Sequence, residues 1–494
     1  MNLDSIIERV REKITADDKA VFIIVLLFLI TALARLLFGL VPWYFLILMV
    51  PLFFVTLLRP KAGLMAIVLL TVLFERFFTL EAFQFGRDVL KLYPLDIILL
   101  GVYGGMIAKI FFGKIRYTWK PADIFFILFF LLATAYFIAS FVGFGSDNMA
   151  VAFSTWKNYV FYGMLFFALP ILCDSEADVR RLVRYFLVAA TFGIVFIVIG
   201  AARGEGLWTE FTPLSTAGVR LLAFPHAFYF SLAFLGMFVS AGYWSTNKYR
   251  FFIWLVMALW MFGILGSLMR HLWIGMALSF VCAFVFLMDE RGRQAARTMG
   301  VIALAFATTL FSLWLFLSFL FPTSTVGEAF QASSQVVAGR VISIGNAADT
   351  SISWRGSTWQ SAFMELSKNP LLGTGFGMRI PVESGEYRDF IEIRNIHNSW
   401  LALLVQMGLL GFLIFVSSLI ALARRVFYLI FDSGAKFLSA VRIVSLTLFL
   451  YQSIVLLAQP YLETNLMGIF FWMTLGLMNT LPALSRKSIE NQTV

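Results

Sequence analysis

Long apolar runs recur along the whole chain, and short polar segments separate them. Runs of about 18 or more apolar residues are typical of transmembrane helices, whereas the strands of a membrane barrel alternate apolar and polar positions. Backbone groups in lipid must be hydrogen-bonded within the protein, so we interpret these runs as helices. The pattern predicts about fourteen spans, near 21–41, 42–58, 62–80, 94–112, 122–143, 157–173, 185–201, 222–243, 250–268, 271–288, 298–321, 398–422, 440–459 and 465–482.

The predicted fold class is therefore all-α, a polytopic transmembrane helical bundle with one large, helical outer loop. The distribution of Lys and Arg indicates which loops lie on the inner side of the membrane, because inner loops of membrane proteins are rich in these residues. Most of the 38 basic residues fall in alternate segments when the N-terminus is inside. This orientation predicts five parts: an inner amphipathic segment, the first part of the bundle, the large outer loop, the last part of the bundle and an inner tail, at 1–20, 21–321, 322–397, 398–482 and 483–494.

Two of these parts have a helical pattern of their own. Residues 3–14 carry apolar side chains at helical spacing, which predicts a helix on the inner leaflet. A frayed charged tail is the alternative. In the outer loop, 354–367 predicts an amphipathic helix with Trp354, Phe363 and Leu366 on its apolar side. A loop this long without structure of its own is unusual, so we expect two or three short helices.

Composition supports a membrane protein and explains the charge. The chain has 494 residues, of which 61% are hydrophobic and 13% charged, whereas soluble domains carry about 25% charged residues. The net charge of +10 follows from the basic inner loops and does not indicate a nucleic-acid partner.

Two arginines at outer helix ends are candidates for binding an anion. Arg270 lies between two apolar runs with almost no loop, where a cation is costly unless it is paired. Arg220 precedes an outer helix start, where a cation opposes the helix dipole. Arginine pairs bidentately with phosphate oxygens, so both suit a lipid-linked phosphate. Snorkelling of Arg270 to the headgroups is the structural alternative.

The outer loop ends in a histidine, His397, followed by Asn398 at the start of the next span. Histidine titrates near neutral pH and is suited to act as a general base. An interfacial histidine satisfied by backbone or headgroups is the alternative. A zinc site from His226, His271 and His397 is conceivable, but no ligand spacing indicates one.

The glycine-rich segment 373–377, GTGFG, resembles a nucleotide-binding loop. No strand precedes it and no P-loop lysine follows it, so we interpret it as a helix stop with tight turns after Pro370. Four acidic residues of the loop remain candidates for holding a cation: Glu383, Glu386, Asp389 and Glu392.

Several motifs together resemble the O-antigen ligase and polymerase superfamily over about 215–415. They are Arg220…Pro225, Ser267-Leu-Met-Arg270, Arg355 with Trp359, Asn369-Pro-Leu-Leu-Gly-Thr-Gly, His397-Asn and Gly408-Leu-Leu-Gly411. Two positions depart from the common pattern: His226 stands where Asn is common, and Leu268-Met269 separate Ser267 from Arg270. Because of these departures, the motifs do not decide whether the chain resembles the ligases or the polymerases of this superfamily.

The resemblance implies an inverting glycosyltransferase, without metal or cofactor, at the periplasmic face of the bacterial inner membrane. The charge pattern places both termini in the cytoplasm. The donor would be a glycan on undecaprenyl pyrophosphate. A ligase passes it to lipid A-core, and a polymerase to another repeat unit. Arg220 and Arg270 would stabilise the pyrophosphate and His397 would be the base. We expect Arg220, Arg270, Arg355, His226 and Asn398 to bind substrate.

Two other classes of function remain. A flippase or transporter would have a similar number of spans, but such proteins place charges near the membrane midplane, often in repeated halves. This chain has only Arg35 deep in a predicted span and no evident repeat. A scaffold for polysaccharide assembly is compatible with the loop but leaves Arg270 unexplained.

Overall fold

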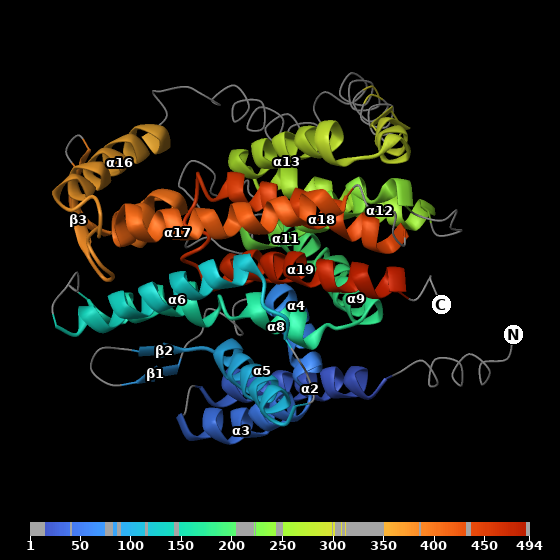
Figure 1. Cartoon of the computed structure of the whole chain (residues 1–494), viewed down its shortest axis with the longest axis horizontal. Coiled ribbons are helices and arrows are strands. Elements are labelled where there is room, and N and C mark those ends of the chain that lie inside the picture. Colours follow the sequence, from blue (N-terminus) through green and yellow to red (C-terminus); the bar gives the residue numbers. More distant parts are fainter. Residues whose placement is uncertain are drawn as a thin grey trace, which may run out of the picture.

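The helices lie side by side in a bundle, and most of them run along one common direction (Figure 1). The structure is a computed structural model. It describes residues 15–39, 42–74, 83–85, 90–113, 117–142, 148–203, 222, 224–243, 250–298, 300–301, 308, 312, 350–384, 387–430 and 436–490. The predicted amphipathic helix at 3–14 and the predicted span at 298–321 fall almost entirely outside the described residues.

The first half of the described chain is helical apart from one short hairpin. Its elements are α2 (Ala16–Phe38), α3 (Pro42–Leu58), α4 (Pro60–Leu73), β1 (Phe83–Phe85), β2 (Leu90–Leu92), α5 (Pro94–Phe111), α6 (Pro121–Ser140), α7 (Met149–Trp156), the π-helix η2 (Lys157–Phe161), α8 (Leu165–Leu172), α9 (Glu176–Phe192) and α10 (Val195–Arg203). Strands β1 and β2 pair antiparallel, with Phe83 opposite Leu92.

The second half adds the remaining bundle and the structured part of the outer loop. Its elements are α11 (Phe224–Val239), η4 (Ala241–Tyr243), α12 (Arg250–Gly266), α13 (Arg270–Cys282), η5 (Ala283–Leu287), α16 (Thr350–Lys368), β3 (Arg379–Ser384), β4 (Tyr387–Glu392), η6 (Ile393–Asn395), α17 (Ser399–Leu429), α18 (Lys436–Val455) and α19 (Asn465–Glu490). Strands β3 and β4 form an antiparallel hairpin, with Arg379 opposite Glu392.

Helix starts follow from local sequence. Proline occupies the first turn of α4, α5 and α6, where its missing N–H costs no hydrogen bond. Thr15 and Asp18 form a capping box at α2. Ser175 caps α9 by accepting from the backbone N–H of Asp178.

Seven of the described helices are long and apolar enough to cross a membrane, and four shorter apolar helices accompany them. The core lies where α6, α8, α17 and α19 pack together. Fully buried Trp472 lies 6.0 Å from Phe126, 5.6 Å from Phe130 and 6.0 Å from Phe415, measured between ring centroids. The prediction of a mostly helical, multi-pass membrane protein is confirmed.

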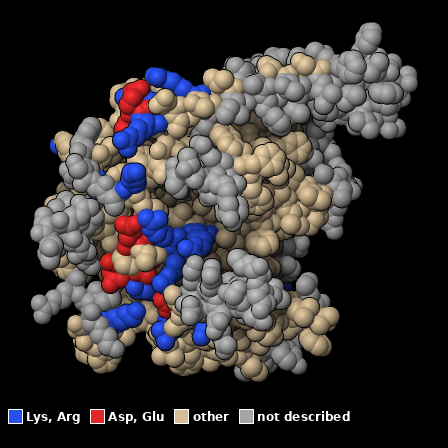
Figure 2. Space-filling view, turned by 90° about the vertical axis from the view of Figure 1, so that its right-hand side faces the viewer, with Lys and Arg blue, Asp and Glu red and all other residues tan. Residues whose placement is uncertain are grey.

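The two ends of the bundle differ. Helix α16 and the β3–β4 hairpin gather at one end, and the last turn of α19 lies at the other (Figure 1). Figure 2 looks onto the second end, where basic and acidic side chains cluster. Lys61 Nζ lies 2.8 Å from Oδ1 of Asp174 and 2.8 Å from Oδ2 of Asp178, and Arg181 Nη1 lies 3.6 Å from Oδ2 of Asp17. The segments that carry these residues lie on the inner side in the predicted topology, and in the structure they meet at one end of the bundle.

Three features differ from the sequence prediction. Helix α9 begins at Glu176 and not near 185, because the Ser175 cap starts the helix before its apolar run does. The described part of the loop contains a hairpin that was not predicted, besides the helices α16, of 19 residues, and η6. Finally, Phe363 is 53% exposed. The packed side of α16 carries Trp359, Ala362 and Leu366 instead, against Ile380 and its neighbours.

Candidate active site

His397 lies just before α17, in a backbone conformation that few residues adopt. Its φ is 55°, in the left-handed region that side chains other than glycine rarely occupy. Its Nδ1 lies 2.8 Å from Oε1 of Gln459. The Trp354 ring meets the imidazole edge-on, at 5.2 Å between centroids and 82° between planes. Contacts from two distant segments therefore hold the ring in one orientation.

The surroundings of His397 favour a neutral ring with a defined tautomer. Burial lowers the pKa of His397, and the nearby charge of Arg355 lowers it further, although the bond to Gln459 opposes both. An amide oxygen can only accept, so the proton lies on Nδ1 and donates to Gln459. The lone pair is then on Nε2, where a base needs it.

Gln459 belongs to the segment between α18 and α19, residues 456–464, which we call the connector. The connector is fixed to the first residue of α17, Ser399. The backbone N–H of Ser399 donates to the Leu456 carbonyl over 2.9 Å, and its Oγ lies 3.2 Å from the Gln459 carbonyl. The backbone N–H of Leu462 donates to the same Oγ over 3.1 Å. The connector and the start of α17 thus form one rigid unit.

The connector also reaches the start of α13, where Arg270 is the first helical residue. Nε2 of His271 lies 2.7 Å from the hydroxyl of Tyr461. Gln459 and Tyr461 are two residues apart, so their Cα atoms are separated by about 7 Å at most. The structure therefore brings the segments of Arg270 and His397, predicted from distant parts of the sequence, to the same short connector.

A buried carboxyl group, Glu463, lies at the end of the connector. It is 5% exposed. Its Oε1 accepts a hydrogen bond of 2.8 Å from the hydroxyl of Tyr159, and its Oε2 accepts one from Ser399. Its backbone carbonyl accepts from Nδ2 of Asn158 over 2.6 Å. Burial raises the pKa of Glu463 to about 7, although the hydrogen bonds from Ser399 and Tyr159 pull it down.

The other predicted site residues have different settings. Arg220 lies outside the described residues. Asn398 caps α17, since its Oδ1 accepts from the backbone N–H of Leu401 over 3.0 Å. His226 is 3% exposed and lies against Phe196, with 4.3 Å between ring centroids. Among the predicted site residues, Arg355 lies near enough to His397 to affect its pKa. Arg270 precedes His271, the residue that is hydrogen-bonded to the connector.

The glycine-rich segment has a structural role that the sequence suggested. Helix α17 is broken at Gly408, whose φ of 62° and ψ of −172° are not helical. The free carbonyls of Val405 and Gln406 accept from the backbone N–H groups of Thr374 and Gly375, over 2.9 and 3.0 Å.

Beyond the break, the N–H groups of Leu409 and Leu410 donate to the carbonyls of Pro370 and Leu371, over 2.9 and 3.2 Å. A Cβ on Gly408 would lie 2.3 Å from the Leu371 oxygen. The close approach of α17 to the segment 370–377 therefore requires glycine at this position. The segment satisfies the backbone of a broken helix, and these groups are not available to bind phosphate.

No metal cluster is found in the part of the chain that the structure describes. Among the acidic loop residues, Glu392 is engaged by arginine: its Oε2 accepts from Nε of Arg394 over 2.6 Å, and its Oε1 lies 4.0 Å from Nη2 of Arg379. Glu386 lies outside the described residues. The three histidines form no metal-binding group, so the zinc alternative is not supported.

Residues 255–416 match the family model described as O-Antigen ligase. This part of the chain is similar to that family. The match confirms the resemblance seen in the sequence, and it includes Arg270, Arg355 and His397. No curated protein matches the chain. The matched segment ends before the connector, so Gln459, Tyr461 and Glu463 lie outside it.

Sequence reasoning missed the connector residues Gln459, Tyr461 and Glu463. They occupy a short turn between two apolar runs, which looks like an ordinary loop. Their partners are distant in sequence: 62 positions separate Gln459 from His397, and 190 separate Tyr461 from His271. One signal was present, namely the acidic residue Glu463 in a very short turn between two predicted spans, close to the hydrocarbon on both sides.

Proposed function

We propose that the protein is a membrane glycosyltransferase of the O-antigen ligase type. It transfers a glycan from undecaprenyl pyrophosphate to an acceptor hydroxyl, with inversion and without a metal ion. The bundle would lie in the bacterial inner membrane, with both termini in the cytoplasm and the end that carries α16 in the periplasm. The connector carries this proposal, because it hydrogen-bonds both His397 and His271, the neighbour of Arg270.

The proposed reaction needs one base and one site for negative charge. Nε2 of His397 takes the proton of the acceptor hydroxyl, and that oxygen attacks the anomeric carbon of the donor sugar. The bond from this carbon to the pyrophosphate oxygen breaks on the opposite face. The electron pair leaves with undecaprenyl pyrophosphate, which needs no proton because it is already a stable anion.

The arginines stabilise that anion in this proposal. Arg270, and Arg220 with it, would pair with pyrophosphate oxygens as charge develops. Removing one such donor typically costs about 10²–10³ in rate. Arg355 would orient the donor sugar, and its charge also lowers the pKa of His397, which keeps the base neutral.

Reconstitution tests the function directly. The purified protein is placed in liposomes with a lipid-linked repeat unit, with or without lipid A-core. A ligase forms product only when lipid A-core is present, whereas a ladder of longer lipid-linked chains would identify a polymerase. Lipid translocation without a new glycosidic bond would contradict both.

Arg270→Ala is the key variant in this assay, with Lys368→Gln as its control. Lys368 is an exposed basic residue of α16 that pairs with Glu365 over 2.6 Å. We expect Arg270→Ala to lose about 10²–10³ in rate and Lys368→Gln to keep it. Full activity of correctly inserted Arg270→Ala would overturn the proposed stabilisation.

A further inference from the structure

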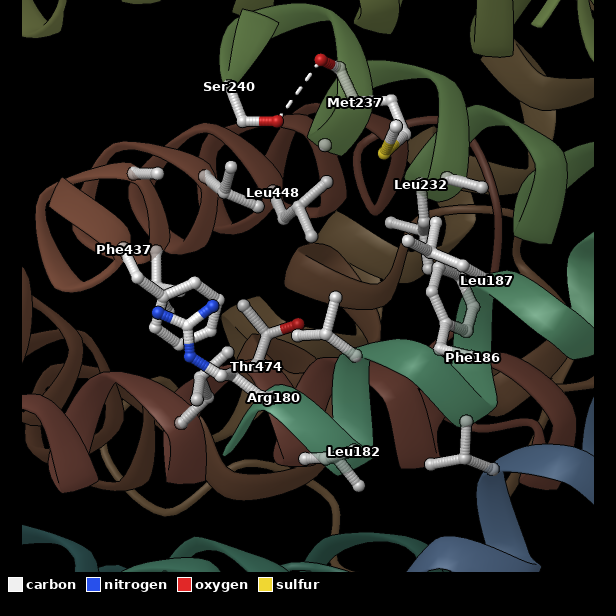
Figure 3. A pocket seen from close by; sticks show the side chains of 18 of the residues that line it. Arg180, Leu182, Phe186, Leu187, Leu232, Met237, Ser240, Phe437, Leu448 and Thr474 are labelled. Atoms are coloured by element: carbon white, nitrogen blue, oxygen red, sulfur yellow. Dashed lines mark hydrogen bonds between the residues drawn. The ribbon is translucent and has the colours of Figure 1, made fainter. Parts of the chain in front are cut away.

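A cavity lies at the end of the bundle opposite to His397. It has a volume of about 540 Å³, within the range of ligand pockets. Helices α9, α11, α18 and α19 form its walls (Figure 3). Arg180 and Phe437 mark one side in this view, and Phe186, Leu187 and Leu232 mark the other. The proposed glycosyltransferase reaction does not use this cavity.

The interior of the cavity presents hydrocarbon. The hydroxyl groups that line it are already hydrogen-bonded within the protein, and that of Tyr243 is bonded to Asp289. Thr474 Oγ1 donates to the Phe470 carbonyl over 2.8 Å and accepts from Gln452. Ser240 Oγ donates to the Met237 carbonyl over 3.1 Å, as Figure 3 shows. A sugar or nucleotide would find no free partner among these groups, whereas an alkyl chain needs none.

The mouth of the cavity is cationic. Lys436, the first residue of α18, lines it, is exposed and has no acidic partner among the described residues. The guanidinium of Arg180 lies 3.9 Å from the centre of the Phe437 ring and donates from Nε to Glu176 over 2.9 Å. Glu176 balances Arg180, so Lys436 is the basic side chain that has no acidic partner among the described residues lining the cavity.

The length of the cavity fits one membrane leaflet. Its lining along α18 runs from Lys436 to Leu448, which is about 18 Å of helix. Half of the hydrocarbon core of a bilayer is about 15 Å thick. A chain anchored by its headgroup at Lys436 would therefore end near the bilayer midplane.

We propose that this cavity binds one acyl chain of an anionic glycerophospholipid, with the phosphate at Lys436. The hydrocarbon interior, the exposed ammonium of Lys436 and the leaflet-long span each match one part of such a lipid. A phosphodiester carries one negative charge, which suits the one ammonium group of Lys436 at the mouth. The lipid would fill the space between α9, α11 and α18 and hold these helices together.

Native mass spectrometry of the purified full chain tests the site. The probes are phosphatidylglycerol and phosphatidylcholine with the same acyl chains. We expect one phosphatidylglycerol to stay bound under conditions that strip phosphatidylcholine, with an affinity ratio of about tenfold from the charged contact. Equal retention of the two lipids would overturn the proposal, as would displacement of phosphatidylglycerol by an equimolar amount of undecaprenyl phosphate.

Three variants locate the lipid. Lys436→Gln removes the cation and should bring the ratio close to one. Gly236→Leu fills the cavity, because a Cβ at Gly236 meets only Val444 at an ordinary 3.5 Å, and should abolish binding of both lipids. Arg297→Gln, which removes an exposed basic side chain outside the cavity, should bind as the wild type does.

A further variant covers the case in which Gly236→Leu does not fold. Ala440→Leu fills the cavity from α18, the opposite wall. If either filling variant folds and keeps wild-type retention of phosphatidylglycerol, the lipid is not in this cavity and the proposal is wrong. Because the assay needs no glycan transfer, its outcome is independent of whether the proposed reaction is correct.

Discussion

Two segments contact α17, and they differ in how easily their sequences are recognised as motifs and in what they do. The segment 370–377, which ends in the glycine-rich residues 373–377, is conspicuous in the sequence, and its backbone hydrogen-bonds the broken helix around Gly408. The connector, residues 456–464, looks like an ordinary turn, and its side chains hold His397 and His271. A conspicuous motif can therefore be structural while the residues that position a base are inconspicuous.

This comparison separates effects on rate from effects on stability. Changes around the connector should alter the reaction and leave the fold intact. Changes at the helix break should alter the fold first. Each experiment below therefore measures both glycan transfer in liposomes and the apparent melting temperature in detergent.

The largest expected effect is on rate, from His397→Ala. A positioned general base contributes about 10²–10⁴ in rate, and we expect a loss of this size with little change in melting temperature. Asn395→Ala is the control, because Asn395 is exposed and only two residues away. A folded His397→Ala protein with wild-type activity would remove the base from the mechanism.

The next effect is on stability, from Gly408→Ala. The new Cβ would lie 2.3 Å from the Leu371 oxygen, at a backbone conformation almost restricted to glycine. We expect a loss of about 2–4 kcal/mol in the free energy of unfolding, measured as a lower melting temperature and yield.

Gly356→Ala is the matched control for this glycine. Gly356 is on α16, where a Cβ would meet nothing within 4 Å, so alanine should be neutral or stabilise by about 0.5–1 kcal/mol. If Gly408→Ala were as stable as Gly356→Ala, the close packing of the two segments would be wrong.

A smaller effect, on pH dependence, should follow from Gln459→Glu. In the wild type the lowered pKa of His397 keeps the base neutral, so the rate should fall only when the pH drops below the ordinary histidine value. A carboxylate at Nδ1 favours the imidazolium and raises the pKa of His397, because an opposite charge stabilises the protonated ring. The acid limb of the pH–rate profile should then move to higher pH.

A neutral variant at Gln459 distinguishes the effect of a charge on the pKa of His397 from the effect of a misplaced imidazole ring. Gln459→Leu removes the hydrogen bond without adding a charge, so it should lower the rate through misplacement of the ring and leave the acid limb at low pH. If Gln459→Glu leaves the limb where the wild type has it, the connector does not control the titration of His397.

Much of the fold could be predicted because it depends on apolar runs, and each described run became a helix close to its predicted place. The errors lie where polar residues extend a helix, as at Glu176, or pair locally, as in the β3–β4 hairpin. For the site, residue type and loop position indicated His397 and Arg270. The partners of these segments could not be predicted, because contacts such as His271 with Tyr461 join segments 190 positions apart and leave no local pattern.

The smallest expected effect concerns Glu463 and stability. Its pKa is about 7 in the folded protein because of burial, and an unfolded glutamate titrates near 4.3. Between these values the folded state binds more protons, so the free energy of unfolding falls as the pH rises from about 4.3 to about 7 and is level above that. The melting temperature of the wild type should therefore be lower at pH 8 than at pH 5.

Glu463→Gln should make that difference smaller, because an amide stays neutral and can still accept from Tyr159. Glu290→Gln is the control, since the Glu290 side chain is 72% exposed and should leave the difference unchanged. An unaltered pH dependence in Glu463→Gln would mean that Glu463 does not titrate in this range. Its hydrogen bonds from Ser399 and Tyr159 would then hold an ionised carboxylate, and the connector would carry a permanent negative charge close to the proposed base.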